Sequence, residues 1–436
     1  MTAVIPFQIM VGGHGTSGYA LRAAGVGRTA EATLVLPPLS SDPEALGRDL
    51  GQALFPNPVR QLLIDVARGA DESGARVQLQ LYVSPPELAV LPWEWATLGG
   101  ETLWRPAVRD DYALVRISHS MPPHPPLELA GPLRLLVACA PGMAAAANAL
   151  APTLAGPVRD GTMVVDLLRD ADLAALRVAL AEEPCHALHL VAADASGQGS
   201  SARLRLGRGL DAAGLIGLLE DYPDLRLLTL AADAGPDPAA LASIAGAIHE
   251  QLGLATVALG GLDATQTAAF CGPCYTALAS YESADLAVTD GRVALEATGG
   301  LWGAPRFWTA PGTGPLFSAA TTPRRAPTNP ADATPVGTVL RPSAAASALG
   351  RTASRALATA RSFVVDATAV GEPAQRQRPA PTRPNWLQPR LVVLLVAALV
   401  LMIMVSQVLP SSDAAPTAPV APTPALILPT IGPLDP

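Results

Sequence analysis

The chain has 436 residues, of which 50% are hydrophobic and 15% are charged, and its net charge is -8 at pH 7. The length favours two or three domains with an ample core, and the mild negative charge argues against the basic field of a nucleic-acid-binding protein. Four scattered cysteines are too few for a disulfide framework and indicate a reducing compartment, while an N-terminus without a basic region predicts no secretory signal.

The first 128 residues read as a β-rich α+β subdomain. Short strand-like runs are separated by Gly and Pro, and one amphipathic stretch has the spacing of a helix. We expect the strands at residues 4–11, 32–36 and 77–83 and the helix at 58–70.

Residues 13–18 read GHGTSG and match the GxGxxG fingerprint of dinucleotide-binding folds. In those folds a long helix follows and directs its dipole at a pyrophosphate. Here the following residues are broken by two glycines, so no such helix is expected. A Gly-rich hairpin turn without a cofactor is the favoured interpretation, because glycine is permissive in turns.

Trp93 and Trp95 flank Glu94 directly after a proline, which is an unusual local cluster. A catalytic Glu94 is one interpretation, but we find no neighbouring residue that would supply the second carboxylate for acid-base chemistry. A packed aromatic corner, in which Glu94 caps backbone groups, is favoured instead.

A proline-rich break at residues 121–126 marks the start of a second unit, residues 129–317. Apolar runs alternate there with helical patterns, which predicts an α/β fold with a doubly wound, mostly parallel sheet. Strands are expected at 133–140, 163–168, 187–193, 225–231 and 255–259, a hairpin at 202–209, and helices at 171–182, 212–220, 238–252 and twice more up to residue 297.

Ligands of parallel sheets bind at the carboxyl ends of the strands. Two of these ends read Ala192-Ala193-Asp194 and Ala231-Ala232-Asp233. Neither end supplies an ordinary nucleophile.

Beyond this unit, residues 318–388 change abruptly to Pro, Ala, Thr and Arg, with one weak helical pattern at 344–365. A segment of this composition cannot bury enough apolar area to order itself. We therefore expect a disordered linker.

A single transmembrane helix is expected at residues 389–410. The stretch from Leu391 to Leu409 is uncharged and nearly all apolar. As a helix it spans roughly 28 Å, close to the thickness of the bilayer's hydrocarbon core, and the alternative of a core helix lacks a core in the flanking sequence. Arginines precede the span, at positions 376, 378, 383 and 390, but none follows in the Pro-rich tail, residues 411–436. The positive-inside rule therefore places the N-terminal part on the cytoplasmic side of the cell membrane.

Several short motifs lie between about residues 80 and 310. They are LPWEWATL (91–98), GPLRLLVACAPG (131–142), HLVAAD (189–194), LTLAADAG (228–235), FCGPCYTAL (270–278), Arg292 and LWGAPRFW (301–308). In order and spacing these motifs resemble the CHAT family, which comprises caspase-like modules often attached to TPR arrays.

The resemblance implies a caspase-like sheet with helices on both faces. Active members are cysteine endopeptidases, in which a His and a Cys at neighbouring strand ends form a dyad. Matched residue by residue, the general-base position is Ala193 and the nucleophile position is Asp233. Alanine cannot accept a proton and a carboxylate is a poor nucleophile toward an amide, so we expect no catalytic residue, no cofactor and no metal.

Other residues offer alternatives to this dyad. Cys139 ends the first strand and His189 lies on the third, so they could form a displaced pair, although a lone buried His is more often a core residue. His14 lies in a GHG triplet but in the wrong subdomain. Cys271 and Cys274 spell CGPC, for which packing is favoured over a redox or metal role because no second Cys/His pair completes a zinc site.

The sequence thus predicts a membrane-anchored, CHAT-like pseudopeptidase. It would act as a scaffold or signalling module at the cytoplasmic face and bind a protein or peptide partner. The alternative is an active caspase-like cysteine endopeptidase that uses a relocated thiol.

Overall fold

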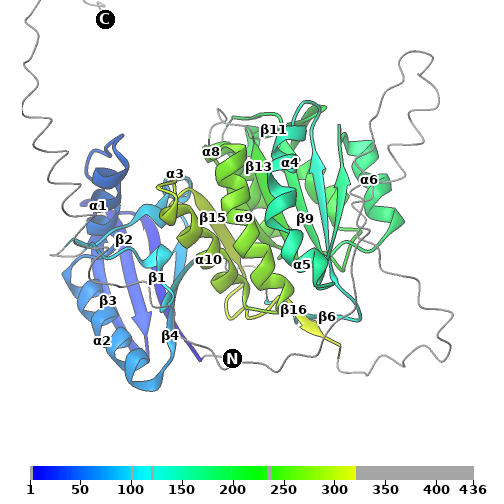
Figure 1. Cartoon of the computed structure of the whole chain (residues 1–436). Coiled ribbons are helices and arrows are strands. Elements are labelled where there is room, and N and C mark those ends of the chain that lie inside the picture. Colours follow the sequence, from blue (N-terminus) through cyan, green and yellow to red (C-terminus); the bar gives the residue numbers. More distant parts are fainter. Residues whose placement is uncertain (1–2, 100–102, 119–121, 198, 233–237, 321–436) are drawn as a thin grey trace, which may run out of the picture. The chain divides into compact units, whose positions relative to one another are not determined.

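One mixed sheet of 11 strands runs through the described part of the chain (Figure 1). A computed structural model describes residues 3–99, 103–118, 122–197, 199–232 and 238–320. In spatial order the strands are β3 (Arg28–Leu34), β2 (Tyr19–Gly25), β1 (Val4–His14), β4 (Arg76–Val83), β5 (Tyr112–Ile117), β15 (Pro305–Thr309), β14 (Ala255–Leu259), β13 (Leu227–Ala232), β9 (Ala187–Ala192), β7 (Leu133–Cys139) and β8 (Met163–Leu168).

The strand directions divide this sheet into two parallel groups. β1, β4, β5 and β15 run parallel to one another, as do β14, β13, β9, β7 and β8. The groups meet at the antiparallel pair β14 and β15, and β2 and β3 extend the first group as antiparallel strands. The expected α/β fold with a mostly parallel sheet is confirmed.

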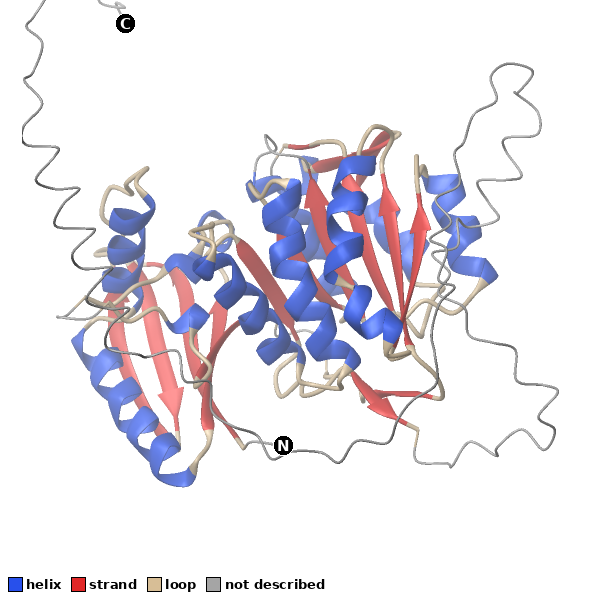
Figure 2. Ribbon diagram, in the orientation of Figure 1, coloured by secondary structure: helices blue, strands red, loops and turns tan. Residues whose placement is uncertain are grey.

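Helices pack on both faces of the second group of strands (Figure 2). One face packs against α4 and α9, and the other against α6, α7 and α8, while α10 packs beside α9 on β5 and β15. The helices are α1 (Pro43–Leu54), α2 (Asn57–Ser73), α3 (Pro86–Ala89), α4 (Ala144–Thr153), α5 (Ala155–Arg159), α6 (Leu173–Glu182), α7 (Ala212–Leu219), α8 (Pro238–Leu252), α9 (Ala264–Ala279) and α10 (Ala284–Ala297).

Burial on both faces explains why the central strands are continuous apolar runs. All six residues of β9 are buried, as expected where helices cover both sides of a parallel strand. Acidic residues start the covering helices: Asp172 caps α6, Asp211 caps α7, and Asp263 forms a capping box with Gln266 at the start of α9.

The observed elements agree with the expected ones most closely in the second unit. β8, α8 and β14 have the expected bounds. The hairpin is formed by β11 (Arg203–Leu206) and β12 (Arg208–Asp211), which turn at Gly207 with a φ of +73°. β10 (Ala195–Ser196) adds a third strand to that hairpin, and β6 (Leu127–Leu129) pairs separately with β16 (Phe317–Ala319).

The GHGTSG segment is the turn of a β1–β2 hairpin, as expected. His14 pairs with Tyr19 across the turn. Gly18 has a φ of +139°, and a Cβ there would lie 2.6 Å from the carbonyl oxygen of Leu34. Only glycine fits this position without strain.

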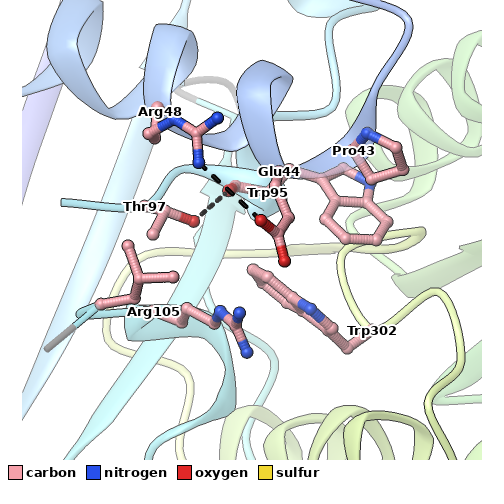
Figure 3. A pocket seen from close by; sticks show the side chains of 8 residues that line it. Pro43, Glu44, Arg48, Trp95, Thr97, Arg105 and Trp302 are labelled. Atoms are coloured by element: carbon pink, nitrogen blue, oxygen red, sulfur yellow. Dashed lines mark hydrogen bonds and ion pairs between the residues drawn. The ribbon is translucent and has the colours of Figure 1, made fainter. Parts of the chain in front are cut away.

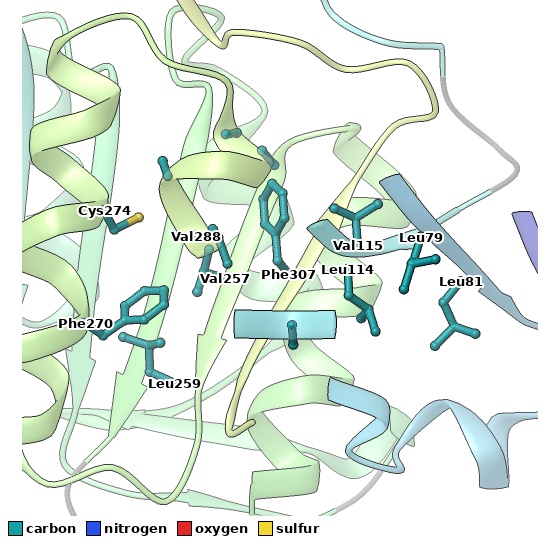
Figure 4. Packing of buried hydrophobic residues seen from close by; sticks show 14 of the residues in the cluster. Leu79, Leu81, Leu114, Val115, Val257, Leu259, Phe270, Cys274, Val288 and Phe307 are labelled. Carbon is teal, nitrogen blue, oxygen red and sulfur yellow. The ribbon is translucent and has the colours of Figure 1, made fainter. Parts of the chain in front are cut away.

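The two groups of strands share one hydrophobic core. Figure 4 shows side chains of this core from Leu79 on β4, through Leu114 on β5 and Phe307 on β15, to Phe270 on α9. Cys274 belongs to the same core.

The Trp-Glu-Trp cluster is a packed corner beside this core. The Trp93 side chain is fully buried and its indole N–H donates to the Leu88 carbonyl. Glu94 does not cap backbone groups, contrary to expectation. Its carboxylate accepts two 2.8 Å hydrogen bonds from the Arg116 guanidinium, because a buried charge is best compensated by a bidentate partner.

Three arginines converge at this corner. Although burial opposes the charge, Arg116, assisted by Arg292 and Arg306, holds the pKa of the Glu94 carboxyl below its ordinary value. Burial also lowers the pKa of Arg292 to about 10. The Arg292 guanidinium donates to the backbone carbonyls of Leu114 and Pro305, and thereby fastens α10 to the junction of β5 and β15.

Several sequence expectations concern residues outside the described ranges. These are Asp233, the linker from residue 321 onward, the transmembrane helix and the tail. The expected start of the linker at residue 318 is wrong, because residues 318 and 319 belong to β16 and pair with β6. None of the helices in the described ranges combines the length and the apolarity that crossing a bilayer requires.

Candidate functional site

The carboxyl ends of β7, β9 and β13 lie beside a small apolar cavity. Its volume is about 70 Å³, well below the roughly 300 Å³ at which small-molecule pockets begin. Of the described residues that line it, Thr267 alone carries a hydroxyl group and none is ionisable. The lining residues are Gly142, Met143, Ala145, Ala146, Val191, Ala231, Ala232, Leu262, Ala264 and Thr267.

Ala193, the expected general-base position, directly follows β9. Its backbone N–H donates to the Arg205 carbonyl at 3.0 Å, so the chain here is tied to β11. The methyl group packs against the hydrophobic cluster on the face of α6, α7 and α8. No proton acceptor is present at this position, and Asp233, the matching nucleophile position, lies outside the described residues.

His189 lies in the middle of β9, and its side chain reaches α9. Its Nδ1 lies 3.0 Å from the Tyr275 hydroxyl, which donates to the Thr229 hydroxyl at 2.9 Å. The same nitrogen lies 3.8 Å from the Cys271 sulfur. The structure therefore places a thiol beside His189, but this thiol is Cys271 and not the expected Cys139.

The electrostatics of this pair oppose nucleophilic catalysis. His189 and Cys271 are each 1% exposed. Burial lowers the pKa of His189 to about 4 and raises the pKa of the Cys271 thiol well above its ordinary value. Both groups are therefore neutral at pH 7, whereas a catalytic pair needs an accessible thiol with a lowered pKa.

The remaining cysteines are equally unsuited to attack a substrate. Cys139, Cys185 and Cys274 are buried free thiols. Burial raises the pKa of Cys139 to about 11 and those of Cys185 and Cys274 to about 12. None of these three thiols is a hydrogen-bond partner of His189 within the part of the chain that the structure describes.

The CGPC segment lies inside α9, with Pro273 in the same helix. Both of its sulfurs are buried in the core, with Cys271 1% and Cys274 2% exposed. Within the described ranges, no group of three or more His, Cys, Asp and Glu residues is arranged to hold a metal ion. Both sulfurs therefore pack among core side chains.

Two other histidines also have structural contacts. His14 is exposed at the end of β1, where its ring makes an edge contact with Tyr19. His186 is half-buried, and its Nδ1 accepts a hydrogen bond from the Arg134 backbone N–H. Neither residue approaches a cysteine sulfur through a contact within the described chain.

A second hollow lies beside the Trp-Glu-Trp corner (Figure 3). Its wall includes Trp95, which packs against Trp302 with 4.7 Å between the ring centroids and 53° between the ring planes, and Arg105, which lies over Trp302. Arg105 also forms an ion pair with Glu296 at 2.6 Å. The hollow has a volume of about 30 Å³, which is enough only for water.

The sequence did not reveal a much larger groove of about 1370 Å³. We call it the α8 groove; α8 contributes Ala242, Ser243, Gly246, Ala247, Glu250 and Gln251, and Gly199 and residues of α7, α3, β15 and the ends of β4 and β5 also line it. The spacing of small residues on α8 was the available signal. The same residues also fit a buried helix face, so this spacing alone does not indicate a groove.

The strand ends therefore form a small, apolar site without an accessible nucleophile among the described residues. Comparison with known proteins gives no family assignment, since no family model and no curated protein matches this chain.

Proposed function

We propose that this protein is a membrane-anchored, CHAT-like pseudopeptidase that binds a protein or peptide partner without cleaving it. The observation that carries the proposal is the apolar cavity at the carboxyl ends of β7, β9 and β13. A cysteine peptidase needs a thiolate, a base and access for an extended peptide at that place. A cavity of about 70 Å³ whose described lining consists of Ala, Gly, Val, Leu, Met and Thr offers none of them among the described residues.

The strand arrangement supports the caspase-like part of the proposal. β8, β7, β9, β13 and β14 form a parallel set, with β15 antiparallel at its end. Helices pack on both faces of this set. Trp308 lies on β15, where the resemblance placed a closing Trp-containing strand.

The membrane anchor remains part of the proposal on the strength of the sequence. The apolar stretch from Leu391 to Leu409 and the arginines before it predict a single span with the globular part in the cytoplasm. Such a protein would present its folded part at the inner face of the membrane and collect a partner there.

An active cysteine peptidase is the second candidate, because Cys271 and His189 lie 3.8 Å apart. Their burial and the pKa directions disfavour it: a thiol that remains protonated beside a neutral imidazole is a weak nucleophile. Catalysis by this pair would require α9 to move away from β9 and expose both side chains.

Labelling of the intact protein in membranes by a thiol-reactive, peptide-like probe separates the two candidates. We expect no labelling of the native protein at neutral pH. Labelling at Cys271 or Cys139 that disappears in a His189→Ala variant would establish the peptidase and overturn the proposal. A Cys185→Ser variant is the matched control. The Cys185 thiol donates to the Ala187 carbonyl and lies away from His189.

A further inference from the structure

The α8 groove is acidic at its edge. Three carboxylates line it, since Glu87 and Glu250 are exposed and Asp211 is partly exposed, and none of its described lining residues is Arg, Lys or His. Asp211 pairs with Arg203 at 3.6 Å, and Glu87 accepts a hydrogen bond from the Tyr19 hydroxyl at 3.0 Å. The Glu250 carboxylate forms no hydrogen bond or ion pair with a described residue. Exposed pairs of this kind are weak and exchange readily, so the groove favours a positively charged ligand.

The inner wall of the groove combines an aromatic ring with small side chains. Trp308 on β15 is partly buried, and Gly246 lets α8 pass close to it, because a Cβ on this glycine would lie 3.5 Å from the indole nitrogen. The indole N–H of Trp308 has no hydrogen-bond partner among the described residues. Tryptophan is enriched at interfaces because its N–H group usually finds a partner when the ring is buried. A ligand in the groove can therefore supply a carbonyl to this donor.

The groove has the size and the lining of a site for a chain segment. Its volume of about 1370 Å³ exceeds the range of roughly 300–1,000 Å³ that is typical of small-molecule pockets. Apolar side chains from β4, β5 and α7 also line it, among them Val83, Ile117 and Ile216. An extended segment suits such a groove better than a helix, because its backbone carbonyls form no hydrogen bonds within the segment and remain available to the Trp308 N–H.

We propose that the α8 groove binds a basic, extended peptide segment of a partner protein. The Arg or Lys side chains of that segment pair with Glu250, which has no competing partner, and replace Arg203 at Asp211. Its apolar side chains pack beside Trp308, and one of its backbone carbonyls accepts the indole N–H. Arginine suits this role better than lysine, because a guanidinium binds a carboxylate in bidentate fashion.

The α8 groove is separate from the cavity at the strand ends. The two have no described lining residue in common, and the cavity is lined from α4 and α9 whereas the groove is lined from α7 and α8. The inference therefore does not depend on whether the protein cleaves peptides. Loss of the proposed groove contact would leave the outcome of the thiol labelling unchanged, and labelling of a thiol would leave the groove contact unchanged.

Selection of short random peptides on phage by the full chain in neutral detergent tests the proposal. We expect the selected peptides to be enriched in Arg and Lys over the starting library and depleted in Asp and Glu. The affinity of a fluorophore-labelled copy of the strongest binder, measured by fluorescence anisotropy, should fall as salt is added, since salt screens exposed charges. A selection that yields no peptide, or peptides without basic enrichment, would overturn the proposal.

An Ala247→Leu variant shows whether the selected peptide lies in the groove. Ala247 lines the groove from α8, so the larger side chain should weaken binding about tenfold or more, the order of effect that extra methylene groups have in an apolar site. The matched control is Ala174→Leu on the exposed surface of α6. This control should bind the peptide as the native protein does.

Two further variants test the polar contacts. Glu250→Gln removes the charge and keeps the shape, and should weaken binding about threefold to fivefold, whereas Glu72→Gln on the exposed surface of α2 should have no effect. Trp308→Phe keeps a ring and removes the N–H, and should weaken binding about fivefold, as expected for one lost hydrogen bond. Because Glu250 is exposed, its replacement leaves the fold intact and decides the matter even if Ala247→Leu does not fold. Equal affinities of the native and Glu250→Gln proteins would overturn the proposal.

Discussion

Replacement of Glu94 by glutamine should destabilise the protein strongly, although the two side chains have nearly the same shape. The Glu94 and Arg116 side chains are 0% and 5% exposed and are joined by two 2.8 Å hydrogen bonds. Removal of one partner from a buried ion pair typically costs about 3–5 kcal/mol because it leaves an uncompensated charge. Here three arginines would share the corner without a carboxylate.

The free energy of unfolding, measured by urea titration of the full chain in detergent, tests this expectation. Glu44→Gln is the control, since Glu44 and Arg48 are 68% and 52% exposed and 3.9 Å apart; its effect should stay below about 0.5 kcal/mol. A Glu94→Gln effect below about 1 kcal/mol would refute the assignment of Glu94 to a structural ion pair.

The same variant should change the pH dependence of stability. The folded-state pKa of Glu94 is lowered, so its contribution is present above the unfolded pKa of about 4.3 and is lost as the pH falls through the folded value. The wild-type protein should therefore lose stability over this acidic window. The Glu94→Gln variant should show a shallower loss there, and equal slopes would contradict the cause given for the lowered pKa.

Three further results are expected. His189 has a folded pKa of about 4, so it stabilises the fold above its unfolded pKa of about 6.5. This contribution, up to about 3 kcal/mol, disappears as the pH falls toward 4. In acid titrations the His189→Gln variant should therefore lose less stability over this pH range than the wild-type protein. Tyr275→Phe should cost about 1–3 kcal/mol in urea unfolding, because it leaves buried His189 and Thr229 without their shared partner. In inside-out vesicles a C-terminal tag should resist added protease while the globular part is digested, and cleavage of the tag would contradict the expected topology.

The sequence was most informative where local pattern and burial coincide. β8, α8 and β14 could be placed to the residue because each is an uninterrupted apolar or periodic run between clear turn signals. β2 was not predicted because most of YALRAAG is Ala and Gly, which carry little strand preference. β5 was not predicted because the aromatic cluster before it obscures the strand pattern. α1 was not predicted because it follows a stretch of Pro and Ser that is typical of a loop.

The candidate site was only partly accessible to sequence reasoning. The resemblance predicted Ala193 and Asp233 as the dyad positions, and of these two the structure describes only Ala193, directly after β9. The contact of Cys271 with His189 depends on how α9 packs across β9, which no local spacing encodes. The partner of Glu94 was likewise missed, since Arg116 is 22 residues away and reaches it only through the pairing of β5 within the sheet.

A protein that binds without cleaving should contain no thiol that acts as a nucleophile in the folded chain. The most direct measurement is the rate of alkylation of each cysteine against pH, followed by mass spectrometry in native protein and in urea. We predict that all four native thiols react far more slowly than the unfolded ones up to pH 9, since all four are buried and their pKa values are raised. Rapid alkylation of Cys271 or Cys139 at pH 7 that is slowed by His189→Ala would contradict the claim.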